Sequence, residues 1–180
     1  VSLRAAGQKL LSSDTIVSAN QKGFYYDILA LRAPSWVEED YRISMTKNLS
    51  SRDPLASFLK FVSSKQRRIS MNESPINVLS AFGGLAIYPV PLLDGCRYEP
   101  KELAPDIWEC EHVGFNAQAL SNGGQMVIIP TLRNRGSLMH TLFAHRLPRH
   151  VLQILILLRV PSLFRKFKGI INASRAKRIQ

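Results

Sequence analysis

The residues best suited to chemistry are concentrated in one segment, 106–116, which reads DIWECEHVGFN. Glu111 and His112 are adjacent in this segment, directly after Cys110. A carboxylate beside an imidazole can accept and pass on protons. Upstream, Gly83 and Gly84 lie within an apolar stretch, and paired glycines allow a ligand to approach the backbone closely. The combination predicts acid–base chemistry on a polar substrate.

The two cysteines, Cys96 and Cys110, leave several interpretations open. They are compatible with a disulfide in an oxidising compartment and with two free thiols in the cytosol. A zinc site that also uses His112 is the least favoured interpretation, because structural zinc sites take four ligands at closer spacing. We expect the protein to be cytoplasmic.

Apolar periodicity predicts the elements that must position these residues. We expect an α/β layered domain with strands at 15–19, 24–31, 76–80, 85–90 and 126–129 and helices at 2–11, 53–66 and 113–120. Gly83 and Gly84 are expected to break or bulge one long strand, and Pro130 to end the last strand. A short acidic helical turn at 36–41 and a polar loop at 94–106 complete the prediction.

Positive charge divides the chain into two parts. The net charge is +11, yet residues 1–132 carry 13 Lys/Arg against 13 Asp/Glu, while residues 133–180 carry 11 Lys/Arg and no carboxylate. In this basic tail, an apolar run at 151–158 precedes a segment in which Phe164, Phe167 and Ile170 share one helical face. The pattern predicts basic amphipathic helices at an anionic membrane surface, or alternatively helices that pack on the domain. Nucleic acid is less favoured, because the sequence shows neither an aromatic-interleaved binding platform nor a helix-turn-helix pattern. No apolar stretch is long enough to span a bilayer.

Four segments resemble a nucleotide-sugar glycosyltransferase of the GT-A type, in the broad family-2-like group. They are 13–32 (SDTIVSANQKGFYYDILALR), 76–88 (INVLSAFGGLAIY), 110–116 (CEHVGFN) and 123–130 (GGQMVIIP). The resemblance covers residues 1–132 and implies the C-terminal part of a Rossmann-like, three-layer GT-A domain with a mixed sheet. That domain would be followed by the basic helices of residues 133–180.

The resemblance also implies a divalent metal, Mn or Mg, in the full-length enzyme. Members hold this ion with a D-x-D motif, which does not occur in these 180 residues. We therefore expect the nucleotide-binding half upstream of Val1 and no metal ligands in this portion, which is expected to be inactive alone.

Residue by residue, the resemblance implies a small set of site residues. Glu111 is the expected catalytic base, and His112 would tune it or contact the diphosphate or the metal. Gly83 and Gly84 would bring backbone against the sugar. Asp27 and Arg32 would lie near the donor or pair with each other. Asn116, in the third segment, completes the expected substrate-binding set.

The expected function is transfer of a sugar from a nucleotide-sugar donor to a saccharide or lipid-linked acceptor, as in polysaccharide biosynthesis. Peripheral attachment to a membrane is expected from the basic tail. The principal alternative is a non-catalytic binding or scaffold module of the same fold. A nucleic-acid-binding protein is a third and less favoured alternative.

Overall fold

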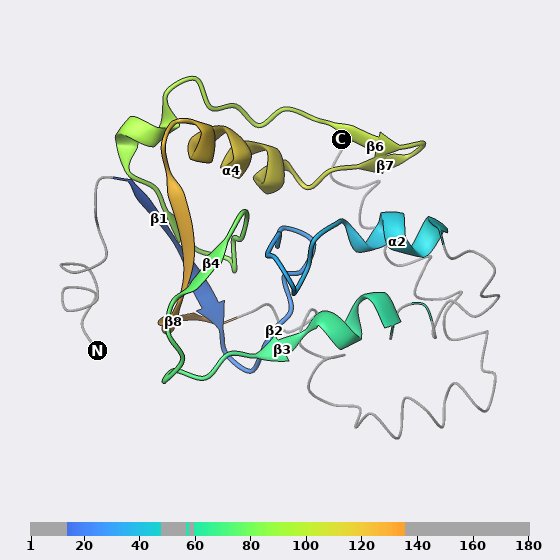
Figure 1. Cartoon of the computed structure of the whole chain (residues 1–180), viewed down its shortest axis with the longest axis horizontal. Helices are drawn as coiled ribbons and strands as arrows, with labels where there is room; N and C mark the ends of the chain where they lie inside the picture. The colour runs from blue at the N-terminus through green and yellow to red at the C-terminus, as the bar shows by residue number, and fades with distance from the viewer. Residues whose placement is uncertain (1–13, 48–56, 58–59, 136–180) are drawn as a thin grey trace.

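The structure, a computed structural model, describes residues 14–47, 57 and 60–135. Its centre is a mixed four-stranded sheet in the order β4 (Ile76–Val78), β8 (Gln125–Asn134), β1 (Thr15–Gln21) and β5 (Ala86–Ile87). β1 and β8 run parallel, and the short strands β4 and β5 are antiparallel to their neighbours at the two edges (Figure 1). The expected α/β class with a mixed sheet is confirmed.

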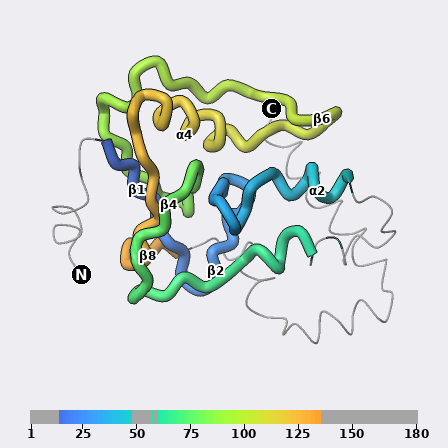
Figure 2. The backbone as a smooth tube through the Cα atoms, viewed as in Figure 1, coloured from blue at the N-terminus to red at the C-terminus, as the bar shows by residue number. Residues whose placement is uncertain are grey.

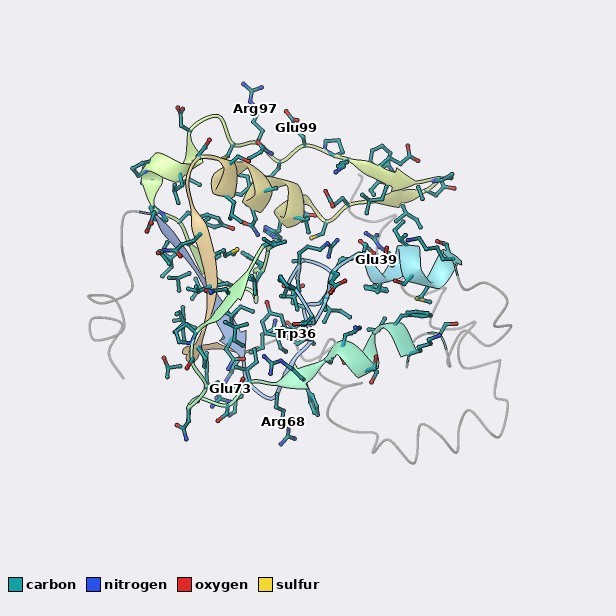
Figure 3. All side chains as sticks on the ribbon, viewed as in Figure 1. Trp36, Glu39, Arg68, Glu73, Arg97 and Glu99 are labelled. Atoms are coloured by element: carbon teal, nitrogen blue, oxygen red, sulfur yellow. The ribbon has the colours of Figure 1, made fainter. Side chains whose placement is uncertain are left out.

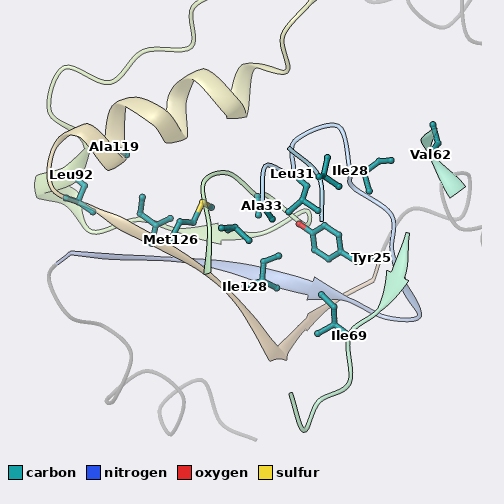
Figure 4. Close-up of a cluster of buried hydrophobic side chains, with 14 residues drawn as sticks. Tyr25, Ile28, Leu31, Ala33, Val62, Ile69, Leu92, Ala119, Met126 and Ile128 are labelled. Carbon is teal, nitrogen blue, oxygen red and sulfur yellow. The ribbon is translucent and has the colours of Figure 1, made fainter. Parts of the chain in front are cut away.

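The two central strands are covered on both faces. All seven residues of β1 are buried, as expected for a strand with a parallel partner and packing on both sides. On one face, Ile16, Met126 and Ile128 belong to the main core, which continues to Tyr25 and Leu31 (Figure 4). On the other face, Val17, Val127 and Ile129 form a smaller cluster.

Helix α4 (Glu111–Ser121) contributes to the main core and leads directly into the sheet. The fully buried Ala119 packs in that core beside Leu92 of the 3-10 helix η2 (Val90–Leu93). Gly123, with φ of 88°, lies in the turn before β8. Figure 2 shows the backbone passing from α4 through this turn into β8.

The remaining described elements are short. Strands β2 (Phe24–Tyr25) and β3 (Arg67–Arg68) form one two-stranded ribbon, and β6 (Glu102–Ala104) and β7 (Ile107–Trp108) form another. Helix α2 (Tyr41–Lys47) and the 3-10 helix η1 (Ser63–Lys65) complete the set. Tyr25 is fully buried and meets Trp36 edge to face at 5.4 Å between ring centroids.

The region of the glycine pair differs from the sequence-based expectation. Residues 76–90 do not form one long strand with a bulge, because β4 pairs with β8 whereas β5 pairs with β1 at the opposite edge. Gly83 and Gly84 instead form the turn that carries the chain between the two edges. Both have positive φ, 63° and 79°, which explains why glycines occupy the turn.

Three further predictions were wrong in their boundaries. The second strand ends at Tyr25 rather than Leu31, because the backbone N–H groups of Tyr26 and Asp27 bond to the side chain of Gln21. The helix expected at 36–41 begins only at Tyr41. Pro130 lies inside β8, where the pairing with β1 shifts register after Ala19 and Asn20 donates its amide N–H to the Pro130 carbonyl at 3.0 Å.

The other expected elements have mixed outcomes. The strand at 15–19 and the helix at 113–120 are confirmed, each longer than predicted. The loop at 94–106 contains β6. Residues 57, 60 and 61 are helical, whereas the end of the helix expected at 53–66 forms the 3-10 helix η1 instead. Residues 53–56, 58 and 59 lie outside the described residues, as do the helix expected at 2–11 and the tail after Arg135. Among the described helices, none combines the length and the hydropathy needed to cross a membrane.

Candidate functional site

Residues 80–84 form a loop that brings the predicted site residues together. The backbone N–H of Gly83 donates to Oδ2 of Asp27 at 3.1 Å. The ring of Phe82 stacks on His112, with centroids 4.0 Å apart and planes inclined by 12°. The amide of Asn116 donates to Oγ of Ser80 at 2.9 Å. Residues from three distant segments therefore meet around one turn.

Glu111 is the first residue of α4, and its side chain is exposed. The partial positive charge at a helix N-terminus attracts negatively charged groups in the first turn. Burial raises the pKa of Tyr98, and the negative charge of Glu111 raises it further. Glu111 directly precedes His112, whose ring meets the Tyr98 ring at 5.7 Å between centroids. The structure thus presents an accessible carboxylate beside an aromatic residue.

Tyr98 is a site residue that the sequence analysis missed. Its ring stacks on Phe115 at 4.3 Å with planes only 7° apart, and its edge meets His112 at 5.7 Å. Even so, 55% of the residue is exposed to solvent. The sequence feature that could have identified Tyr98 is its position as an aromatic residue in a polar loop, where no helical or strand periodicity accounts for it.

His112 has an unused hydrogen-bonding atom. Its Nδ1 is buried and has no hydrogen-bond partner in the part of the chain that the structure describes. A buried polar atom without a partner costs about 1–3 kcal/mol. Because the ring is held between Phe82 and Tyr98, a ligand or a water molecule at this nitrogen would meet a fixed imidazole.

The two cysteines are free thiols, and they lie apart in different surroundings. Cys96 donates to the Leu92 carbonyl at 3.2 Å. Burial raises the pKa of the Cys110 thiol to about 11, with the charges of Glu111 and Asp27 adding to the rise and Arg32 opposing it. Cys110 is therefore protonated at neutral pH, which is unfavourable for a nucleophile or a metal ligand.

The described residues do not fit a metal site of their own. Across residues 14–47, 57 and 60–135, no three His, Cys, Asp or Glu side chains are grouped closely enough to hold an ion. Neither the zinc alternative nor a Mn or Mg site is therefore supported by a donor set in this part of the chain.

Arg32 is occupied by contacts within the protein. Its Nη1 donates to the carbonyls of Leu29 and Leu31, and its Nη2 lies 3.6 Å from Oδ2 of Asp40. The Arg32 side chain is 9% exposed and that of Asp40 is fully buried. Arg32 therefore forms its ion pair with Asp40, whereas Asp27 accepts from Gly83.

Asn116 holds α4 against the loop. Its Nδ2 donates to Ser80 Oγ and, at 3.3 Å, to the Ala81 carbonyl, while its Oδ1 accepts from the hydroxyl of Tyr88 at 2.7 Å. The residue is fully buried. Direct contact with a substrate would require this network to open, so the geometry favours a positioning role.

Gly83 packs against the backbone of β1. An ideal Cβ at this position would lie 2.1 Å from the Ala19 carbonyl oxygen, a contact that requires the backbone to move. Gly84 is exposed, and its Cβ would meet Nδ2 of Asn134 at 2.5 Å, a side chain that has more freedom to move.

We expect Gly83→Ala to destabilise the fold, because the new methyl group overpacks against backbone at a positive φ. The free energy of unfolding should fall by about 1–3 kcal/mol, measured by urea denaturation. Gly95→Ala is the matched control, since its φ is 68° but no atom lies within 4 Å of its Cβ. Equal losses in the two variants would show that φ strain, and not the contact with Ala19, makes glycine necessary at position 83.

Comparison with known proteins adds no relative. No family model matches the chain, and no curated protein or solved structure that was compared with it does so either.

Proposed function

We propose that the chain is the acceptor-binding part of a glycosyltransferase that moves a sugar from a nucleotide-sugar donor to a saccharide or lipid-linked acceptor. The observation that carries the proposal is the first turn of α4, where the exposed Glu111 directly precedes His112 and the ring of His112 meets Tyr98. The GT-A assignment and a cytoplasmic location peripheral to a membrane belong to the same proposal.

In this reaction, Glu111 takes the proton from the acceptor hydroxyl as its oxygen attacks the anomeric carbon of the donor. The new bond from oxygen to carbon forms while the bond from that carbon to the diphosphate breaks, and its electron pair leaves with the diphosphate. A positioned base accelerates proton removal by about 10²–10⁴-fold. No step is assigned to a metal ion, since the described residues form no site for one.

The stacked rings of Tyr98 and Phe115 are suited to binding a sugar acceptor. One face of Tyr98 is covered by Phe115, and the large exposed fraction of the residue leaves ring surface open beside His112, the neighbour of Glu111. A sugar ring has faces of C–H groups that pack on aromatic surface, while its hydroxyl groups reach polar side chains. Tyr98 would thus hold the acceptor with a hydroxyl directed to the base.

We expect Tyr98→Ala to raise the KM for the acceptor about tenfold, with little change in the KM for the donor, because an aromatic contact of about 1.4 kcal/mol is lost. Tyr98→Phe keeps the ring and should retain the acceptor KM. Initial-rate kinetics with each substrate varied in turn measure both values. A Phe variant as impaired as the Ala variant would assign the effect to the hydroxyl instead of the ring.

The proposal as a whole is tested by release of nucleoside diphosphate. The enzyme that carries the complete catalytic domain is incubated with UDP-sugars and GDP-sugars, with and without a saccharide acceptor. Acceptor-stimulated release with at least one donor is expected. Donor binding without release, measured by calorimetry, would instead indicate the non-catalytic module.

A further inference from the structure

A group of basic side chains surrounds the β2–β3 ribbon, on elements separate from the candidate site. We call this group the cationic ribbon and define it as Lys22, Arg67, Arg68 and Arg133. Strand pairing sets Arg68 opposite Phe24 and Arg67 opposite Tyr25. The backbone N–H of Lys22 donates to the carbonyl of Asn134 at 3.0 Å, which places the end of β8 beside the start of the two-stranded β2–β3 ribbon. All four side chains belong to exposed residues.

Neighbouring groups hold the three arginines in place. The guanidinium of Arg67 lies 4.5 Å from the centroid of the Trp36 ring, and that of Arg68 lies 4.9 Å from the Phe24 ring. Arg133 reaches the sulfur of Met71 with Nη1 at 3.5 Å. Such stacking fixes the cations without neutralising them.

Little negative charge offsets the cationic ribbon. Within the described residues, the ion pair formed by its members is that of Arg67 with Glu73, at 3.4 Å and with both side chains partly exposed. Four cations and one paired carboxylate leave a net positive surface. An exposed surface of this kind attracts anions over about one Debye length.

We propose that the cationic ribbon binds the headgroups of acidic lipids and so docks the folded domain on an anionic membrane. Met71, 53% exposed, adds an apolar side chain among the cations. The Trp36 and Phe24 rings are already stacked with guanidinium groups, whereas single-stranded nucleic acid is bound by stacking bases on open rings. Cations together with apolar surface therefore favour a lipid surface.

The sequence that follows the described residues supports this partner. β8 ends at Asn134 beside Lys22, so the described residues end next to the cationic ribbon. Residues 136–180 then carry nine Lys/Arg and no Asp/Glu, with the apolar run VLQILILL at 151–158. A basic segment with apolar residues binds anionic bilayers, and each Lys or Arg near the surface strengthens binding about fivefold. The tail and the cationic ribbon would bind the same anionic membrane surface.

The structure supplies a control on another face of the molecule. In Figure 3, Arg68 lies at the lower edge and Arg97 at the upper edge, above α4. Arg97 is exposed, like the members of the cationic ribbon. If the cationic ribbon faces the membrane, Arg97 is directed away from it, and its charge should contribute little.

Flotation of the 180-residue chain with phosphatidylcholine vesicles, with and without phosphatidylserine, tests the proposal. The triple variant Arg67→Gln, Arg68→Gln, Arg133→Gln should bind phosphatidylserine vesicles at least about tenfold more weakly, at unchanged thermal stability. Arg97→Gln should bind like the wild type. Because the triple variant also removes ring contacts, the pair Lys22→Gln, Arg133→Gln, which spares both stacked arginines, should by itself weaken binding several-fold.

Two results would overturn the proposal. Wild-type affinity in the triple variant would mean that the tail binds lipid without the domain. Preferential binding of a single-stranded oligonucleotide over phosphatidylserine vesicles in competition, lost in the same variants, would make the surface a nucleic-acid site. Neither result bears on the proposed sugar transfer, because the readout is vesicle binding, although both bear on the proposed membrane location.

Discussion

Replacement of Glu111 by Gln should lower the kcat of sugar transfer by roughly a hundredfold or more in the enzyme that carries the complete catalytic domain. Gln keeps the shape of the side chain but cannot accept the proton of the acceptor hydroxyl. The loss should fall on kcat because the base acts on the proton in the transition state. Glu111 is exposed at the start of α4, so the change should leave the free energy of unfolding nearly unaltered.

The matched control for this experiment is Glu99→Gln, the same substitution at an exposed carboxylate in the loop before β6. Figure 3 shows Glu99 at the upper edge of the molecule. Steady-state kinetics should find the kcat of this variant unchanged, and calorimetric titration should find its Kd for the donor unchanged. Near-normal turnover of Glu111→Gln would remove Glu111 as the base, and equal losses in the two variants would indicate a general effect of charge.

Elements with a strong local signal were predicted well from the sequence. β1 opens with the β-branched residues Thr15, Ile16 and Val17, and β8 contains the apolar run at 126–129, which is buried on both faces. The helix at 113–120 was predicted before the turn at 121–124, and α4 is that helix extended by two residues at its start and one at its end. Glu111 and His112 were predicted as site residues from their adjacency together with the glycine pair upstream and the family resemblance.

What the sequence could not predict is decided by contacts between distant residues. Residues 76–90 form two strands and not one because β4 pairs with β8 whereas β5 pairs with β1. Both partners lie far away in the sequence. Asn116 sits in the expected motif, but its amide is used by Ser80, Ala81 and Tyr88, 28–36 positions away. No local pattern distinguishes such an asparagine from one that faces a substrate.

Asp40 shows the same limit most clearly, because it lies outside every motif and yet is the most completely buried charge among the described ion pairs. Its carboxylate accepts from Nε and Nη2 of Arg42 at 2.9 and 2.7 Å. Arg42 also donates from Nη2 to the Trp108 carbonyl at 2.6 Å, just before the first turn of α4. Arg32, Asp40 and Arg42 therefore tie the loop after β2 to the segment that carries Glu111.

We expect Asp40→Asn to lower the free energy of unfolding by about 3–5 kcal/mol at neutral pH, because the buried guanidinium of Arg32 loses its counter-charge. Glu39→Gln is the matched control, since its ion pair with Lys47 is exposed and should be worth less than about 1 kcal/mol. Urea denaturation measures both values. Losses of equal size would mean that the burial of Asp40 adds nothing to the ion pair.

The pH dependence of stability gives an independent check on Asp40. Burial raises the pKa of this carboxyl, but the hydrogen bonds from Arg42 and the charges of Arg42 and Arg32 outweigh burial and leave the pKa below its ordinary value. A carboxyl with a lowered pKa in the folded state stabilises the fold above its unfolded pKa of about 4. That stabilisation is lost as the pH falls from there toward the folded pKa. The wild type should therefore lose stability in this acid range more steeply than Asp40→Asn, and parallel curves for the two proteins would show that Asp40 is not the titrating group.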